Sequence, residues 1–218
     1  MFTMLDRFRG KSYKDRLLNP HDEFWDRRLG VRTFGYHPAM GDPGDNDWRV
    51  HYTPTPYSDI FRLLRMVDLR SDDVFVDLGA GMGRAVFAAS WLGARRAVGI
   101  EVVQHLCDKA AQNHRRSRLA SRDIEFICTN AQDYRNGDTT VLFMFHPFGE
   151  PTLRQVLHNI ESVRMEEPRR TLRIIYVNPV YDSVLQQTKW LKCIGRVPKV
   201  ASWLSTAIHY DTTLWQSY

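Results

Sequence analysis

The chain has 218 residues, 43% of them hydrophobic, which suits one compact domain with a sizeable core and an appended arm but not a second full domain. Its formal net charge at pH 7 is +5, and arginine supplies most of the 30 basic residues. It contains no apolar run of about 18 residues, and its start lacks the charged-then-apolar order of a secretory signal. We therefore expect a cytoplasmic protein that does not cross a membrane.

Cysteine and arginine usage bounds the class of protein further. Cys107, Cys128 and Cys193 are odd in number and widely spaced, and two fall in apolar patterns, which favours reduced core thiols over disulfides or a zinc site. We predict no metal.

Arginines gather at 95–96, 115–122 and 169–173, where they could attract phosphate backbones or acidic substrates. Acids are interspersed throughout, so an ordinary solvated surface is equally consistent, and charge alone does not predict a nucleic acid partner.

The first 56 residues show no clear hydrophobic period. Turn formers and aromatic side chains crowd the stretch 34–48, and the many aromatics disfavour disorder. Two prolines in Tyr52–Pro56 hold the backbone near extended geometry. We predict a helical and loop arm over 1–56 that covers a ligand site, followed by the main domain at 57–218.

From residue 57 onward helical and strand periods alternate, which predicts βα units and a mainly parallel sheet. Helices are expected around 57–67, 83–92, 103–118 and 153–160, and strands at 74–76, 96–101, 124–127, 140–145 and 172–177. Two closing strands are expected near 190–197 and 206–216. The run 140–145 is continuously apolar, as is typical of a central strand covered on both faces.

The most informative stretch is Asp77–Gly83, between a predicted strand and a predicted helix. Gly79, Gly81 and Gly83 lack Cβ atoms, so the turn can adopt positive φ and a ligand can approach the backbone at the helix start. A dinucleotide-binding turn would need glycine at position 84, where this chain has Arg84. The G-x-G-x-G spacing, with an acid two residues before the first glycine, resembles motif I of class I S-adenosylmethionine (SAM) methyltransferases.

This resemblance implies a Rossmann-like, mostly parallel sheet with a C-terminal antiparallel strand, and SAM as the cofactor. In that family the glycine turn, here Gly79, Ala80, Gly81 and Gly83, faces the amino acid part of SAM. The leading acid, here Asp77, helps to hold the ammonium group of SAM.

Two further strand ends are candidates for the cofactor site. Glu101 ends the next strand, roughly 20 residues beyond the glycines, where nucleotide folds place the acceptor for the ribose hydroxyls; a solvated strand-end acid is the alternative. By resemblance, Asn130 takes the position that pairs with the adenine amino group, and Ala131 is small enough for the ring to lie flat. Asp133 is an alternative in another register, and Asn130 could instead form an Asx turn.

His146-Pro147-Phe148 occupies the place of motif IV. In enzymes that methylate adenine or glutamine this motif reads (Asp/Asn/Ser)-Pro-Pro-(Tyr/Phe), so the histidine and phenylalanine argue against those acceptors. The chain is more similar to a less characterised bacterial group with Asn-Pro-Phe-Gly here, Tyr-x-Pro-Thr-Pro before the first helix, and a segment like Asp26-Arg-Arg28 in the arm.

Methyl transfer is an in-line displacement, and a hydroxyl or protonated amine acceptor needs a base. His146 at a strand end can serve near neutral pH, although it can equally be a hydrogen-bonded wall of the pocket. Tyr52, His37 and Asn178 are secondary candidates on the substrate side.

The sequence therefore predicts a SAM-dependent methyltransferase that acts on a hydroxyl or amino group of a small molecule, because an aromatic cover suits a compact ligand. Two alternatives remain: a methyltransferase for protein lysine or nucleic acid, and a SAM-binding module without catalysis. A nucleic acid or an acidic protein is a possible partner without further support at this stage.

Overall fold

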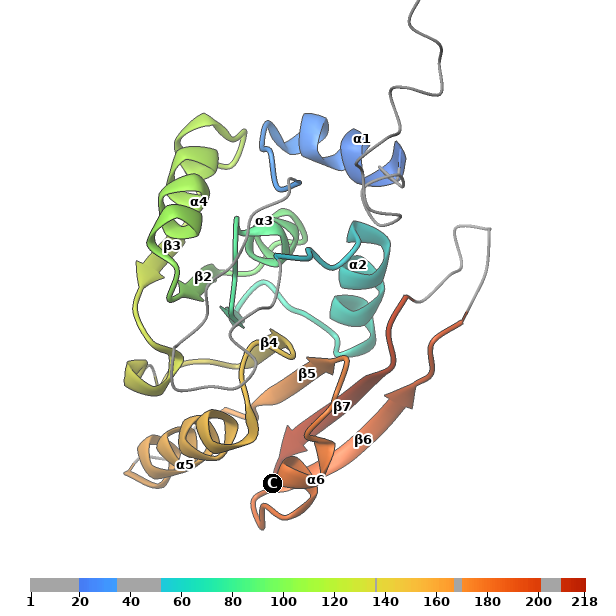
Figure 1. Cartoon of the computed structure of the whole chain (residues 1–218), viewed down its shortest axis with the longest axis vertical. Helices are drawn as coiled ribbons and strands as arrows, with labels where there is room; N and C mark the ends of the chain where they lie inside the picture. Colours follow the sequence, from blue (N-terminus) through green and yellow to red (C-terminus); the bar gives the residue numbers. More distant parts are fainter. Residues whose placement is uncertain (1–19, 35–51, 136, 167–169, 201–208) are drawn as a thin grey trace, which may run out of the picture.

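The computed structural model describes residues 20–34, 52–135, 137–166, 170–200 and 209–218. Seven strands form one sheet in the order β3-β2-β1-β4-β5-β7-β6, which runs from β3 to β6 across Figure 1. The strands are β1 (Val74–Leu78), β2 (Arg96–Glu101), β3 (Ile124–Cys128), β4 (Val141–Phe145), β5 (Arg173–Val177), β6 (Leu191–Val197) and β7 (Thr212–Ser217). β7 is antiparallel to β5 and β6, whereas all other neighbours pair in parallel. The expected Rossmann-like sheet with a C-terminal antiparallel strand is confirmed.

Two hydrophobic cores lie on the two faces of this sheet. The helices are α1 (Pro20–Leu29), α2 (Tyr57–Met66), α3 (Arg84–Trp91), α4 (Gln104–Arg116), α5 (Glu150–Glu166) and α6 (Asp182–Gln186), with a short 3-10 helix η2 (Ala131–Asp133). One core joins α2 and α3 to Phe75 and Phe143, and the other joins α5 and α6 to Val76 and Leu142. Alternate residues of one strand point to opposite faces, which explains why β4 is apolar throughout.

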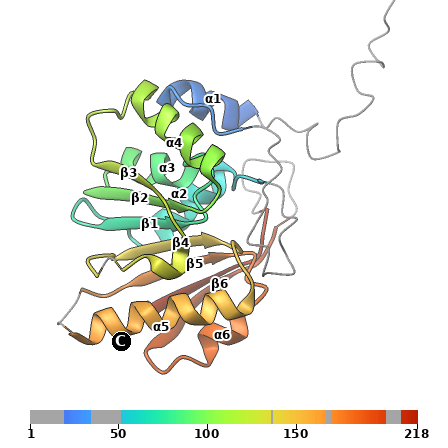
Figure 2. The ribbon, with the colours of Figure 1, turned by 60° about the vertical axis from the view of Figure 1, so that its left-hand side comes forward.

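The arm contributes to the first core. Leu29 is fully buried, and Val31 is nearly so, in the same cluster as α2 and α3. Trp25 of α1 packs its ring against Phe61 of α2 at 4.6 Å between centroids. Figure 2 shows α1 and α4 gathered toward the β3 side of the sheet, and α5 and α6 toward the β6 side. Residues 20–34 are therefore packed on the domain as part of its structure.

The cysteines correct one expectation. All three are free, but only Cys107 is buried, whereas Cys128 and Cys193 are exposed. Cys128 ends β3 and Cys193 lies in β6, and these are the two edge strands of the sheet, so the prediction of core thiols was wrong for both.

Within the described ranges, no three or more histidine, cysteine, aspartate or glutamate side chains are grouped to hold a metal. No helix in those ranges is long and apolar enough to span a bilayer.

Candidate active site

The glycine turn joins the carboxyl end of β1 to the start of α3. Gly79, Gly81 and Gly83 all have positive φ, at 81°, 54° and 92°. A Cβ atom added to Gly79 would lie 2.6 Å from Cβ of Pro147, and one added to Gly81 would lie 2.1 Å from Cε2 of Tyr52. Glycine is thus required here both by backbone conformation and by the side chains that lie against the turn.

Glu101 holds the turn in place from β2. Its Oε2 accepts a hydrogen bond from the Gly81 amide at 2.8 Å, and its Oε1 accepts from the Val102 and Val103 amides at 2.9 and 3.0 Å. Burial raises the pKa of this carboxyl, and the three amide hydrogen bonds oppose that rise. A carboxylate has about four acceptor positions, so Oε2 retains room for one further donor such as a ribose hydroxyl. A second hydroxyl would need an acceptor position that a backbone amide already occupies.

Asp77 lies beneath the turn and is only 5% exposed. Burial raises the pKa of its carboxyl well above the usual value, and the neighbouring Glu101 raises it further. No side chain or amide in the described part of the chain donates a hydrogen bond to this carboxyl. A buried acceptor without a donor is unfavourable, so a cationic group of a ligand would stabilise it. The ammonium of SAM fits this requirement.

Tyr52 connects the arm to the turn. Its ring lies against Gly81, and its hydroxyl donates to the Thr33 carbonyl oxygen at 2.8 Å. Burial is the main cause that raises the pKa of this hydroxyl, which therefore stays protonated near neutral pH. We regard Tyr52 as a wall of the cofactor pocket better suited to positioning than to proton abstraction. His37, another sequence candidate, lies outside the described residues.

Arg84 anchors the arm from the first position of α3. Its guanidinium is 3% exposed, donates to Thr33 Oγ1 and Asp22 Oδ2 at 2.8 Å each, and lies 4.9 Å from the ring centroid of Tyr57. Asp26 accepts hydrogen bonds from the same threonine, at 2.7 Å to its amide and 2.6 Å to its hydroxyl. In the sequence Arg84 served only to exclude a dinucleotide turn, and no local pattern indicated this anchoring contact.

The predicted adenine side lies next to Glu101. The Thr129 amide donates to the Glu101 carbonyl oxygen at 3.0 Å, which holds the following residues beside the β2 end. Asn130 Oδ1 accepts from the Gln132 amide at 3.0 Å and so begins η2, the Asx-type contact that was the alternative interpretation. Ala131 is partly buried against the second core. Adenine recognition by Asn130 stays a prediction. It would use the second acceptor position of Oδ1 and the Nδ2 hydrogens of the side chain.

The substrate side is built at the ends of β4 and β5. His146 and Asn178 follow the paired residues Phe145 and Val177, and both have positive φ, at 37° and 51°. Such conformations are uncommon outside glycine and cluster at functional sites. The next residue after His146 is Pro147, which lies against Gly79, so the two halves of the site are directly joined.

Two tyrosines lie beside His146, and a second aromatic pair belongs to the core on the other face of the sheet. His146 Nδ1 lies 3.4 Å from the Tyr176 hydroxyl oxygen, and its ring centroid lies 5.3 Å from that of Tyr181. Phe145 packs against Tyr210 at 4.5 Å between centroids. Burial raises the pKa of Tyr176 to about 12, so its hydroxyl remains neutral. The arrangement combines one titratable imidazole with aromatic faces.

Comparison with known proteins places the chain in a family. The profile described as "Histone methylation protein DOT1" matches residues 50–130, which include the glycine turn, Glu101 and Asn130. A protein-lysine N-methyltransferase of Saccharolobus islandicus is 30% identical over 160 residues, covering 67% of this chain and 94% of that protein. The chain belongs to the class I SAM-dependent methyltransferases. Its cofactor is SAM.

Solved structures of methyltransferases show the same fold with different substrates. An RNA methyltransferase from Salinibacter ruber, in complex with S-adenosyl-L-homocysteine, is 23% identical with a TM-score of 0.55 and covers 76% of this methyltransferase and 94% of its own chain. A precorrin-6y C5,15-methyltransferase from Geobacter metallireducens is 16% identical with a TM-score of 0.54 and covers 73% and 86%. The fold is therefore shared, and it does not identify the acceptor.

Proposed function

We propose that this methyltransferase acts on the ε-amino group of lysine in a protein. The observation that carries the proposal is the position at the end of β4, where Tyr176 and Tyr181 lie beside the His146 imidazole, next to the glycine turn. Aromatic faces attract a cationic or partly alkylated amine. The Saccharolobus relative is a protein-lysine N-methyltransferase, which supports the same acceptor. The small-molecule acceptor expected from the sequence was inferred from the aromatic segment 34–48, most of which lies outside the described residues.

The cofactor side is assigned to the residues predicted from the sequence. Gly79, Ala80, Gly81 and Gly83 offer bare backbone to the amino acid part of SAM, Asp77 faces its ammonium, and Glu101 accepts from its ribose. Asn130 and Ala131 border the adenine. When bound, SAM supplies an activated methyl carbon for transfer to a nucleophile.

His146 is proposed as the base that takes the proton of the lysine ammonium. Its Nδ1 lies 3.4 Å from the Tyr176 hydroxyl oxygen, and donation of an Nδ1–H to that oxygen would fix the tautomer in which Nε2 is the basic nitrogen. Tyr176 keeps its own proton because its pKa is raised to about 12, so it orients the imidazole without competing for the proton.

The acceptor is tested with isotopically methyl-labelled SAM and three acceptor pools: a mixture of small basic proteins, total RNA, and free amino acids with small amines. The proposal expects label on lysine residues of protein, located by peptide mass spectrometry. Label that is released by ribonuclease, or found only on free amines, would refute it.

The base is tested with His146→Asn. Asparagine tolerates the positive φ of this position but lacks the imidazole, so the fold should persist. We expect kcat near pH 7 to fall by about 100-fold or more while SAM affinity is kept. A variant with unchanged kcat would show that His146 is a wall of the pocket and not the base.

The cofactor side is tested by calorimetry of Gly81→Val, Glu101→Ala and Asp77→Asn with SAM and with S-adenosylhomocysteine. Parental affinity in all three variants would refute the proposed cofactor site.

A further inference from the structure

The ends of α1 and α4 meet on one flank of the molecule. The Arg118 amide donates to the Leu29 carbonyl oxygen at 2.8 Å. The Asn113 side chain of α4 accepts from the Arg32 amide and donates to the Arg32 carbonyl oxygen, both at 3.0 Å. Two segments about 80 residues apart in sequence are therefore fastened side by side, and Figure 1 shows α1 and α4 together at the top of the molecule.

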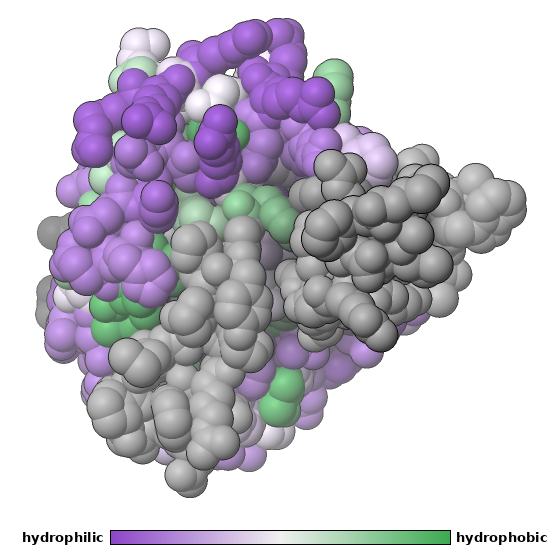
Figure 3. Space-filling model, turned by 45° about the horizontal axis from the view of Figure 1, so that its top comes forward, coloured by the Kyte–Doolittle hydropathy of each residue, from purple (hydrophilic) through white to green (hydrophobic). Residues whose placement is uncertain are grey.

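This contact brings exposed arginines from both segments onto one surface. We call it the arginine flank, and it consists of Arg28, Arg32, Arg115, Arg116, Arg118 and Arg122. None of these side chains forms an ion pair with a carboxylate of the described residues, although Arg28 lies 5.2 Å from the ring centroid of Trp91. The surface over α1 and α4, in the upper part of Figure 3, is predominantly hydrophilic.

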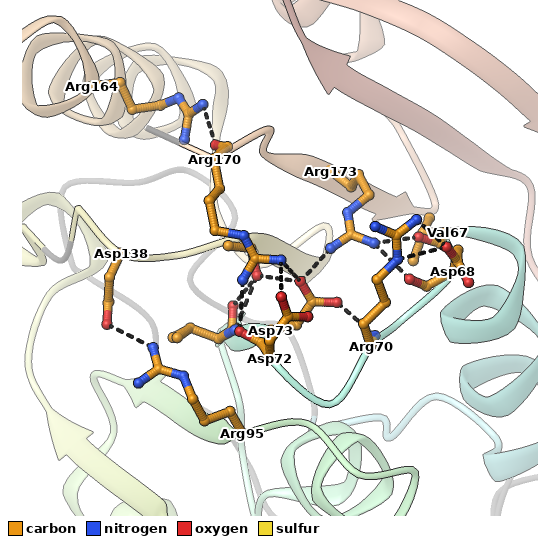
Figure 4. A network of polar contacts seen from close by, with 12 residues as sticks. Val67, Asp68, Arg70, Asp72, Asp73, Arg95, Asp138, Arg164, Arg170 and Arg173 are labelled. Atoms are coloured by element: carbon orange, nitrogen blue, oxygen red, sulfur yellow. Dashed lines mark hydrogen bonds and ion pairs between the residues drawn. The ribbon is translucent and has the colours of Figure 1, made fainter. Parts of the chain in front are cut away.

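The described members of the other arginine groups that the sequence indicated pair with carboxylates. Arg95 pairs with Asp138 at 3.6 Å, and Arg96 pairs with Glu125. Arg170 and Arg173 meet in a network around the buried Asp73, which Figure 4 shows. Of these arginine groups, the one on the flank has no carboxylate partner in the described chain.

Helix capping does not account for all of the flank. Basic residues in the last turn of a helix interact favourably with its dipole, and Arg28, Arg115 and Arg116 occupy such positions. Arg32, Arg118 and Arg122 lie beyond the ends of both helices. Their repulsion from the other arginines is therefore not offset within the described chain.

We propose that the arginine flank binds the phosphodiester backbone of a nucleic acid. Guanidinium groups pair with phosphate through two parallel hydrogen bonds, and a duplex offers about one negative charge every 1.7 Å along its axis, a denser line than an acidic peptide presents. Arg32 directly precedes Thr33, which holds the Tyr52 wall, so a bound strand would lie beside the catalytic pocket. This inference goes beyond the proposed function, because such binding requires neither SAM nor a lysine acceptor.

The experiment compares two triple variants of the full chain that lose the same charge. One is Arg115→Gln, Arg116→Gln and Arg118→Gln on the flank. The matched control is Lys189→Gln, Lys192→Gln and Lys199→Gln, whose exposed lysines lie in or beside β6 at the opposite edge of the sheet. Fluorescence anisotropy measures binding to a short mixed-sequence DNA duplex and to a short RNA hairpin over a range of salt concentrations, with polyglutamate as a third probe. Circular dichroism and SAM calorimetry check that both variants are folded.

We expect the flank variant to bind nucleic acid about tenfold more weakly or worse at low salt, and its plot of log K against log salt to lose about 3 units of slope, one for each lost phosphate contact. The lysine control should resemble the parent. Stronger binding of the duplex or of the hairpin identifies the source of the phosphates. Equal losses in the two variants, no loss in the flank variant, or tighter flank-dependent binding of polyglutamate would overturn the proposal. None of these outcomes depends on whether the protein methylates lysine, which the labelled-SAM experiment measures separately.

Discussion

Two groups of arginines in this methyltransferase have opposite surroundings. Around Asp73, which is completely buried, Arg173 and Arg170 pair with the carboxylate, and the Thr140 hydroxyl donates to it at 2.8 Å (Figure 4). On the arginine flank, by contrast, the side chains are exposed and carry no carboxylate partner in the described chain. The same residue type therefore stabilises the fold in one place and leaves charge for a partner in the other. The two groups differ because only the first has a buried carboxylate, Asp73, to pair with.

The largest expected effect follows from removing that carboxylate. Asp73→Ala leaves Arg173, which is mostly buried, without its counter-charge, and also removes the acceptor for the Arg70 amide at 2.6 Å. We expect the free energy of unfolding to fall by about 3–5 kcal/mol in urea titrations. The control, Asp138→Ala, breaks a half-exposed pair and should cost less than about 1 kcal/mol. Similar losses in the two variants would mean that the buried carboxylate is not what distinguishes the Asp73 network.

Arg84 tests whether a buried arginine next to the pocket behaves like the Asp73 network. Arg84→Met removes the hydrogen bonds to Thr33 and Asp22 and should lower the free energy of unfolding by about 2–3 kcal/mol. Because Thr33 also holds Tyr52 against the glycine turn, SAM affinity measured by calorimetry should fall as well. Arg84→Lys keeps the charge without the planar fork and should recover only part of both losses. Parental SAM affinity in Arg84→Met would show that the contacts of Arg84 with the arm do not influence the cofactor pocket.

The contrast between the arginine groups also marks what the sequence could and could not predict. Apolar runs such as 140–145 and the spacing of Ile60, Leu63 and Leu64 predicted β4 and α2, because periodicity reports local burial. The pairing of Arg173 with Asp73 joins side chains 100 residues apart, and no local pattern encodes it. The meeting of Arg32 with α4 is equally non-local.

The candidate site was predictable to a similar extent. The glycine turn, Glu101 and His146 follow from motif spacing at strand ends. The carboxyl ends of β1, β2 and β4 do lie together, because Glu101 accepts from the Gly81 amide and Pro147 lies against Gly79. The hydrogen bond from the Gly81 amide to Glu101 joins segments 20 residues apart, and no local pattern encodes it. The sequence likewise does not indicate the positive φ of His146 and Asn178. The sequence around Arg84 indicates only that a dinucleotide-binding turn is absent, because its contacts with Thr33 and Asp22 span more than 50 residues.

Acid pH offers a gentler way to remove the Asp73 charge. Burial alone would raise the pKa of this carboxyl, but hydrogen bonds from the Arg70 amide, Arg173 and Thr140 outweigh it and lower the pKa below its usual value. A lowered folded-state pKa means that the stabilisation is fully present above the unfolded pKa of about 4 and is lost as the pH falls through the folded value. The stability difference between the parent and Asp73→Asn should therefore be constant from pH 5 to 8, as approximate limits, and shrink below about pH 4. A difference that persists at pH 2, an acid limit of about this value, would show that the amide substitution acts through packing.

The smallest expected effect belongs to the flank, where two contributions oppose each other. In the triple variant of Arg115, Arg116 and Arg118, the loss of dipole interactions at the end of α4 destabilises the protein, while relief of repulsion stabilises it. The free energy of unfolding should stay within about 0.5 kcal/mol of the parent for each substitution. Added salt screens both contributions, with a screening length of about 10 Å at 0.1 M, so the sign of the salt effect shows which one is larger. We expect the repulsion to be larger. Thermal melts of the parent should therefore shift upward with salt more than those of the variant. Equal shifts would mean that the flank arginines do not repel one another. The contrast between unpaired arginines on the flank and paired arginines around Asp73 would then have no effect on stability.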